Sequence, residues 1–208
     1  YVVDSDYKFL SFDPAKGANT FKPINTLNCN AGDAWPDWDT TEASPFSMSV
    51  DRKGAAWVLY TSGEIFSVST KTGQCTATSF SKGQKGYQLF GMGFVSDTTG
   101  SEKEKLYIFG GSVGNLAKGT LGFVDPSTLA ASTIGPITFS ESSPELTGTG
   151  NAGLFGFFPN GSKSVVREID KTNGAVLHTW PVTGASGEIS AWAFAHWGGK
   201  FYIFISIS

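Results

Sequence analysis

The sequence predicts an all-β protein, a β-propeller of four-stranded antiparallel blades. Three observations lead to this fold class. An outline of strand, polar turn and strand occurs four times along the 208 residues, and a second kind of strand pair alternates with it. No long segment has apolar residues at the i, i+3, i+4 spacing of an amphipathic helix. Four strands per unit, repeated at about 45–55 residues, are typical of propeller blades.

The four hairpins share a turn that begins with Asp or Ser. Such a residue accepts hydrogen bonds from backbone N–H groups ahead of it, and the Gly or Asn that usually follows tolerates a positive φ. The anchors are Asp13, Ser69, Asp125 and Asp170. The predicted hairpins span residues 9–24, 65–80, 121–137 and 165–182.

The second kind of strand pair has an inner strand rich in Gly, Ala and Ser, as a crowded central strand requires. These pairs span residues 46–60, 91–111, 146–159 and 191–207. A two-sheet sandwich is the alternative, because it also has many short strands. Turn chemistry that repeats along the chain favours the propeller, since sandwiches do not repeat their turns at a fixed period.

The sequence predicts one propeller domain over residues 1–208, with residues 30–45 as an inserted loop. The chain enters on outer strands and ends on an inner pair, so both ends together could build one blade and close a ring of four blades. Alternatively, the chain is a fragment of a propeller with a fifth blade. Residues 1–4 favour the fragment, because they already resemble one strand more than a four-blade ring needs. The apolar final strand also suggests self-association through terminal strand edges.

Composition indicates a secreted, periplasmic or otherwise extracellular protein. Charged residues make up 16% of the chain, against about 25% in an average soluble domain. With a net charge of −3 and no polybasic stretch, nucleic acid and anionic membrane surfaces are excluded as expected partners. No apolar run approaches the roughly 20 residues of a spanning helix, so no membrane insertion is expected.

Two cysteines, Cys29 and Cys75, are an even number and predict one disulfide. Two separate buried thiols are the alternative. One geometric objection to the disulfide is that Cys29 follows the last strand of one blade while Cys75 precedes the last strand of the next. Such positions tend to lie on opposite faces of a propeller.

The hairpins of the form FDP…G, the segment PFSMSVDRKGAAWVLYTSGEIFSVSTKTGQC and the strand KLYIFGG resemble secreted β-propeller proteins of bacteria. Similar chains occur in uncharacterised propeller families of myxobacterial type. The resemblance covers most of the chain and implies a secreted or periplasmic propeller. It implies no catalytic residue.

The inserted loop, NAGDAWPDWDTTEASP, is the best candidate for a binding site. Its predicted ligand-binding residues are Trp35, Asp37, Trp38 and Asp39. A Trp ring can cover the apolar face of a sugar while carboxylates accept hydrogen bonds from its hydroxyls. Calcium could use the same carboxylates, although the spacing does not match an EF-hand. Alternatively, both Trp rings fold back onto the blade. Long loops in compact domains are often functional.

Catalytic motifs find little support in the sequence. No HExxH or P-loop sequence occurs, and the Gly-rich segment GGSVGNLAKG (residues 110–119), whose first five residues match GxSxG, lies between predicted strands without the helix that should follow it. Acyl transfer, zinc proteolysis and nucleotide hydrolysis therefore lose their usual support. His178 is expected on an outer strand. His196 is either a polar turn residue or a group at the channel mouth, where Asp51 and Asp97 also end inner strands. No catalytic or metal-binding residue is assigned, and no cofactor is expected apart from calcium.

Three functions remain open at this point. The first is a secreted, non-catalytic binding or scaffold propeller that recognises a carbohydrate or protein partner through its loop face. The second is a propeller enzyme of lactonase or lyase type with a cation at the channel mouth. The third is a structural protein that assembles through its strand edges. Fold alone does not choose among them.

Overall fold

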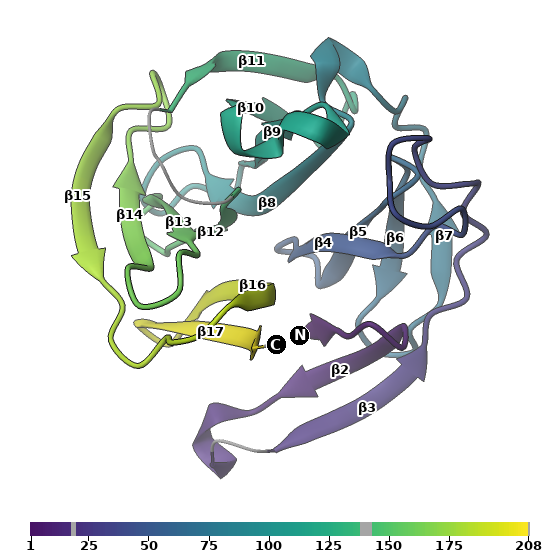
Figure 1. Cartoon of the computed structure of the whole chain (residues 1–208), viewed down its shortest axis with the longest axis horizontal. Helices are drawn as coiled ribbons and strands as arrows, with labels where there is room; N and C mark the ends of the chain where they lie inside the picture. The colour runs from purple at the N-terminus through teal and green to yellow at the C-terminus, as the bar shows by residue number, and fades with distance from the viewer. Residues whose placement is uncertain (18–19, 138–142, 208) are drawn as a thin grey trace. The chain divides into compact units, whose positions relative to one another are not determined.

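The computed structural model describes residues 1–17, 20–137 and 143–207 (Figure 1). Their regular secondary structure is almost entirely β-strand. They divide into two compact units, residues 1–82 and residues 83–208. No helix in these ranges is long and apolar enough to cross a membrane.

Unit 1 contains two antiparallel sheets whose neighbouring strands follow one another along the chain. The first sheet has three strands: β1 (Val2–Val3), β2 (Lys8–Phe12) and β3 (Phe21–Thr26). A 3-10 helix, η1 (Pro14–Lys16), lies in the turn between β2 and β3. The second sheet has four strands: β4 (Pro45–Val50), β5 (Ala55–Tyr60), β6 (Ile65–Ser69) and β7 (Cys75–Ala77).

Unit 2 repeats the four-stranded arrangement twice and adds a two-stranded sheet. Its first sheet contains β8 (Leu89–Ser96), β9 (Glu104–Gly111), β10 (Thr120–Val124) and β11 (Ala131–Pro136). Its second contains β12 (Glu145–Gly148), β13 (Leu154–Phe158), β14 (Val165–Ile169) and β15 (Val176–Pro181). The hairpin consists of β16 (Ile189–Trp197) and β17 (Lys200–Ile207). Two further 3-10 helices are η2 (Gln84–Gly86) and η3 (Val113–Lys118).

Each four-stranded sheet is a propeller blade, so the predicted fold class is confirmed. The strands of a blade are antiparallel and joined in chain order, which is the pattern that propellers repeat. Each of the four predicted outer hairpins and each of the four predicted inner pairs is present as an antiparallel strand pair.

The polar anchors of the hairpins make the hydrogen bonds that the sequence predicts. The Asp125 carboxylate accepts bonds from the backbone N–H groups of Ser127 and Thr128, at 2.8 and 3.2 Å. Asp170 accepts one from Thr172 at 2.8 Å. Hydroxyl and backbone hydrogen bonds to their carboxylates lower the pKa of both Asp125 and Asp170. The turns at Asp13 and Ser69 have the same kind of bond.

Small residues let the inner strands of unit 2 approach one another closely. A Cβ atom placed on Gly93 of β8 would lie 2.7–2.8 Å from backbone atoms of Leu146 and Thr147 in β12. The blade β8–β11 and the blade β12–β15 also share one hydrophobic core. Its fully buried side chains include Phe109, Leu121 and Phe158.

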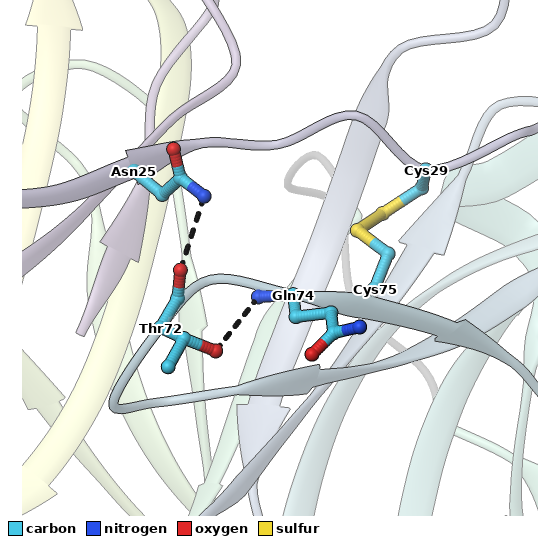
Figure 2. Close-up of a disulfide and its surroundings, with 5 residues drawn as sticks. All are labelled: Asn25, Cys29, Thr72, Gln74 and Cys75. Carbon is cyan, nitrogen blue, oxygen red and sulfur yellow. Dashed lines mark hydrogen bonds between the residues drawn. A yellow bond between two sulfur atoms is a disulfide. The ribbon is translucent and has the colours of Figure 1, made fainter.

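A disulfide joins Cys29 to Cys75 within unit 1, with Cα atoms 5.2 Å apart (Figure 2). The predicted pairing is therefore confirmed, and the expectation that the two positions lie on opposite faces is wrong. Because each strand is rotated by about 20–25° from its neighbour, the outermost strand of a blade is turned far from the innermost one. The end of β3 consequently meets the β6–β7 turn, where the Asn25 side-chain amide donates to the Thr72 carbonyl at 3.0 Å.

Candidate functional site

The inserted loop is held against the first complete blade by backbone hydrogen bonds. Asp33 and Glu42 form an isolated antiparallel bridge, and the Ala34 N–H donates to the Thr41 carbonyl at 2.8 Å. The Trp35 N–H donates to the carbonyl of Thr61, in the β5–β6 turn, at 3.0 Å. The loop is therefore an ordered excursion between β3 and β4.

The two Trp rings of the loop lie against the blade and are half-buried. The Trp35 indole covers Gly63, where a Cβ atom would come within 2.8 Å of its Nε1. Trp38 packs against the core of unit 1 and meets Phe46 edge-on, with ring centroids 5.6 Å apart. The Lys82 ammonium lies 5.3 Å from the Trp35 ring centroid. Asp37 and Asp39, the other two predicted ligand-binding residues, are exposed.

A pocket of about 500 Å³ lies beside this loop, entirely within unit 1. Its walls come from the β1–β2 turn, the end of β3 with the chain that follows it, both arms of the loop and the end of β5. The lining residues are Tyr7, Thr26, Leu27, Asn28, Cys29, Ala31, Gly32, Asp33, Thr41, Glu42, Ala43 and Tyr60. The loop thus contributes main-chain and carboxylate walls to the pocket, whereas Trp35, Asp37, Trp38 and Asp39 do not line it.

Tyr7 is held in an unusual backbone conformation at the pocket wall. Its φ is +62°, a left-handed value that is costly for a bulky residue and common at functional positions. The hydroxyl donates to the Ala43 carbonyl at 3.1 Å, and the Tyr7 carbonyl accepts a bond from the Leu27 N–H at 2.7 Å. Partial burial, and then the nearby Glu42 carboxylate, raise the pKa of Tyr7.

Tyr60 also lines the pocket, and its hydroxyl is buried. The residue is 1% exposed, and its hydroxyl has no hydrogen-bond partner among the residues that the structure describes. Its ring meets Phe66 edge-on at 5.2 Å between centroids. Burial, with a smaller contribution from Tyr7, raises the pKa of Tyr60 to about 12. A buried hydroxyl without a partner is costly, and this one belongs to the core of unit 1 behind the pocket surface.

The disulfide fixes one wall of the pocket. Cys29 lines the pocket, and its partner Cys75 begins β7. The chain segment that carries Asn28 and Cys29 is therefore tied covalently to the blade on which Tyr60 lies. Nearby, the Glu64 carboxylate accepts bonds from the Gly32 N–H and the Ser62 hydroxyl, both at 2.8 Å.

The remaining charged candidates are not among the residues that line this pocket. Asp51 accepts bonds from the Ala55 N–H and from the Trp57 indole, so it stabilises the β4–β5 turn. Asp97 lies 3.5 Å from the Lys105 ammonium, and its carbonyl accepts a bond from Lys171 at 2.8 Å.

The two histidines belong to an aromatic cluster on unit 2. The His178 Nδ1 atom lies 2.8 Å from the Glu168 carboxylate, and its ring stacks on Trp180. His196 contacts Phe201 edge-on, and burial lowers its pKa. Across residues 1–17, 20–137 and 143–207, no three His, Cys, Asp or Glu side chains are grouped to hold a metal ion.

Sequence patterns alone miss the two tyrosines of the pocket. Tyr7 lies in the DSDY turn, and Tyr60 ends a strand whose apolar run resembles any core strand. The only local signal is the Asp-Ser-Asp turn before Tyr7. Nothing in the sequence indicates that Tyr7 and Tyr60, 53 positions apart, line the same pocket.

Comparisons with known proteins add a likeness in fold to solved structures. No family model matches the chain, and no curated protein matches it. Among solved structures, the chain is similar to one described as "Structure of Dos1 propeller", with 15% sequence identity and a TM-score of 0.45. The alignment covers 74% of this chain and 40% of that chain. This chain therefore matches less than half of the other chain's length.

Proposed function

We propose that this propeller is a non-catalytic binding module that takes a glycan in the pocket of Tyr7 and Tyr60, beside the loop 30–45. The observation that carries the proposal is the mixed lining of the pocket, in which apolar side chains stand beside hydroxyl, amide and carboxylate groups. Ligand pockets combine apolar walls with a few placed polar groups and measure about 300–1,000 Å³. This pocket, at about 500 Å³, has both properties.

The lining suits a sugar ring in particular. Leu27, Ala31 and Ala43 supply apolar surface for the C–H face of the ring, while threonine hydroxyls, the Asn28 amide and carboxylates can bond its hydroxyls. Because the Trp rings of the loop are half-buried and do not line the pocket, their role in this proposal is to hold the loop against the blade.

The proposal includes a location outside the cytosol. A disulfide supports an oxidising compartment, because cytosolic reductants keep most thiols reduced. The low charge content of the chain also suits an extracellular protein.

Glycan-array binding followed by titration calorimetry tests this function. Thr41 is an exposed pocket-lining residue, so Thr41→Trp should fill the pocket and weaken glycan binding at least about tenfold. The matched control is Thr76→Trp on β7, an exposed threonine that does not line the pocket; it should bind like the wild type. If no glycan binds, or if Thr41→Trp binds as well as the control, the proposed function is wrong.

A further inference from the structure

The turn between β13 and β14 contains the acceptor sequence for N-linked glycosylation. Asn160, Gly161 and Ser162 match the pattern Asn-x-Ser/Thr, in which the middle residue is not proline. No other Asn in the sequence is followed by Ser or Thr at the second position. The triplet also fits an ordinary turn, because Asn and Gly both favour turns. Which role Asn160 has therefore depends on what its side chain does in the fold.

Backbone groups of Asn160, and not its side chain, hold this turn. The Asn160 N–H donates to the Ser164 hydroxyl at 2.8 Å, and the Asn160 carbonyl accepts a bond from the Lys163 N–H at 2.9 Å. The Ser164 hydroxyl donates in turn to the Gly161 carbonyl at 2.7 Å, and Ser164 is buried. The turn is therefore defined without the side-chain amide of Asn160.

The side-chain amide of Asn160 has no bonding role in the structure. Among the residues that the structure describes, neither this amide nor the Ser162 hydroxyl has a hydrogen-bond partner, and both residues are exposed. Asn173 provides the contrast, because it also precedes a Gly in a hairpin turn. Its side-chain oxygen accepts a bond from the Ala175 N–H at 2.8 Å. Turn chemistry thus explains the side chain of Asn173 but not that of Asn160.

Gly161 occupies the middle of the acceptor sequence for a local reason. Its φ is +50°, and a Cβ atom there would lie 3.0 Å from the carbonyl oxygen of Gly187, on the β15–β16 connection. A left-handed position this close to another backbone segment favours glycine. Gly161 and Ser164 therefore keep the shape of the turn, while the side chains of Asn160 and Ser162 remain accessible to an enzyme.

The compartment is a separate requirement for this modification, and the disulfide supports it independently. N-linked glycans are attached in the secretory pathway, where thiols can also oxidise to disulfides. Cys29 and Cys75 are joined in unit 1, whereas Asn160 lies in unit 2. The acceptor sequence, the exposed and unbonded amide, and the disulfide are thus three separate observations that favour glycosylation.

We propose that Asn160 accepts an N-linked glycan when the chain enters a secretory pathway. The donor is an oligosaccharide joined through a diphosphate to a membrane lipid. A bond forms between the Asn160 Nδ2 atom and C1 of the first sugar, while the bond from C1 to the diphosphate oxygen breaks. The lipid diphosphate leaves with the electron pair of that bond, and Nδ2 gives one of its two protons to a base of the transferase. The Ser162 hydroxyl is a recognition group for the transferase.

Peptide mass spectrometry of the secreted protein tests the proposal. The full chain, fused to a cleavable secretion signal, is produced in eukaryotic cells and treated with a peptide N-glycosidase in heavy-oxygen water. This enzyme hydrolyses the bond between asparagine and glycan and leaves an aspartate that contains heavy oxygen. The intact mass should fall on treatment, and the label should appear at position 160.

Variants of the turn test whether the acceptor sequence is responsible. Asn160→Gln and Ser162→Ala should both be secreted without the glycan. Because neither side chain has a hydrogen-bond partner among the described residues, both variants should melt at the same temperature as the deglycosylated wild type. Ser162→Thr keeps a hydroxyl and should retain the glycan. Lys163→Ala is the matched control, because it changes an exposed neighbour outside the triplet, and it should be modified like the wild type.

Two results would overturn this proposal. One is a secreted wild-type chain in which the Cys29–Cys75 bond has formed and position 160 is unmodified. The other is equal modification of Ser162→Ala and the wild type, because the hydroxyl would then not be recognised. The glycan pocket is a separate matter, since Asn160 is not among the residues that line it. Asn160→Gln should therefore bind glycans like the wild type, and either proposal can fail without the other.

Discussion

At the scale of single residues, Tyr60 should make stability depend on pH in the alkaline range. Its pKa is raised from its usual value near 10 to about 12 in the folded protein. Because the pKa is higher in the folded than in the unfolded protein, the contribution of Tyr60 to the free energy of unfolding is complete below the unfolded-state pKa. It falls by roughly 2–3 kcal/mol as the pH rises from about 10 through 12. Urea unfolding at about pH 9 and about pH 11.5 measures this loss.

Tyr60→Phe is the matched variant for that measurement. It removes a hydroxyl that has no partner among the described residues, so its free energy of unfolding near neutral pH should equal or exceed that of the wild type by up to about 1 kcal/mol. Tyr7 and Tyr107, whose pKa values are also raised by burial, remain in both proteins. An alkaline loss of the same size in both proteins would contradict this account.

Gly93 shows how little space the inner strands leave. A methyl group there would lie within 2.8 Å of three backbone atoms of Leu146 and Thr147, and backbone cannot move aside as a flexible side chain can. Gly93→Ala should therefore destabilise the protein by about 2–3 kcal/mol, as overpacking does. The control Gly114→Ala meets no atom within 4 Å and should change stability by less than about 0.5 kcal/mol. Urea midpoints compare the two, and equal midpoints would contradict close approach of β8 and β12.

At the scale of elements, the two Trp side chains of the loop 30–45 should contribute to the stability of the folded protein. Trp35 covers Gly63, and Trp38 packs on the core beside Phe46. Replacing both with Ala should cost roughly 3 kcal/mol, near the lower end of the range for buried Trp because the rings are half-buried. Thermal and urea unfolding measure the cost. Asp37→Asn with Asp39→Asn is the control and should change the free energy of unfolding by less than about 0.5 kcal/mol. If the Trp double variant is as stable as the wild type, the two rings do not pack on the blade.

At the scale of the whole molecule, the disulfide should stabilise unit 1 selectively. It closes a sequence separation of 46 residues within residues 1–82, and cross-links of this kind contribute about 2–4 kcal/mol. Cys29→Ser with Cys75→Ser should therefore accelerate backbone hydrogen exchange in β2, β3, β6 and β7. Exchange in β8–β15 should stay near the wild-type rate. Equal acceleration in both units would mean that they unfold as one cooperative body.

Local chemistry explains why the strands could be predicted from the sequence. The anchors Asp13, Ser69, Asp125 and Asp170 hydrogen-bond to the backbone two or three residues ahead, so each turn is determined within a few residues. The small inner strands likewise have a composition that suits crowding. Repetition of both patterns was enough to predict the blades and the order of their strands.

Tertiary structure alone decided the candidate site. Tyr7 lines the pocket from a strained turn, and Tyr60 from the end of an apolar strand. No pattern in the sequence links the two positions. The Cys29–Cys75 contact also depends on the twist of the blade, which turns its outermost strand and brings β3 to the β6–β7 turn. Turns and strands follow from neighbours in sequence, whereas a pocket and a cross-link depend on where distant segments meet, and that is set by packing of the whole unit.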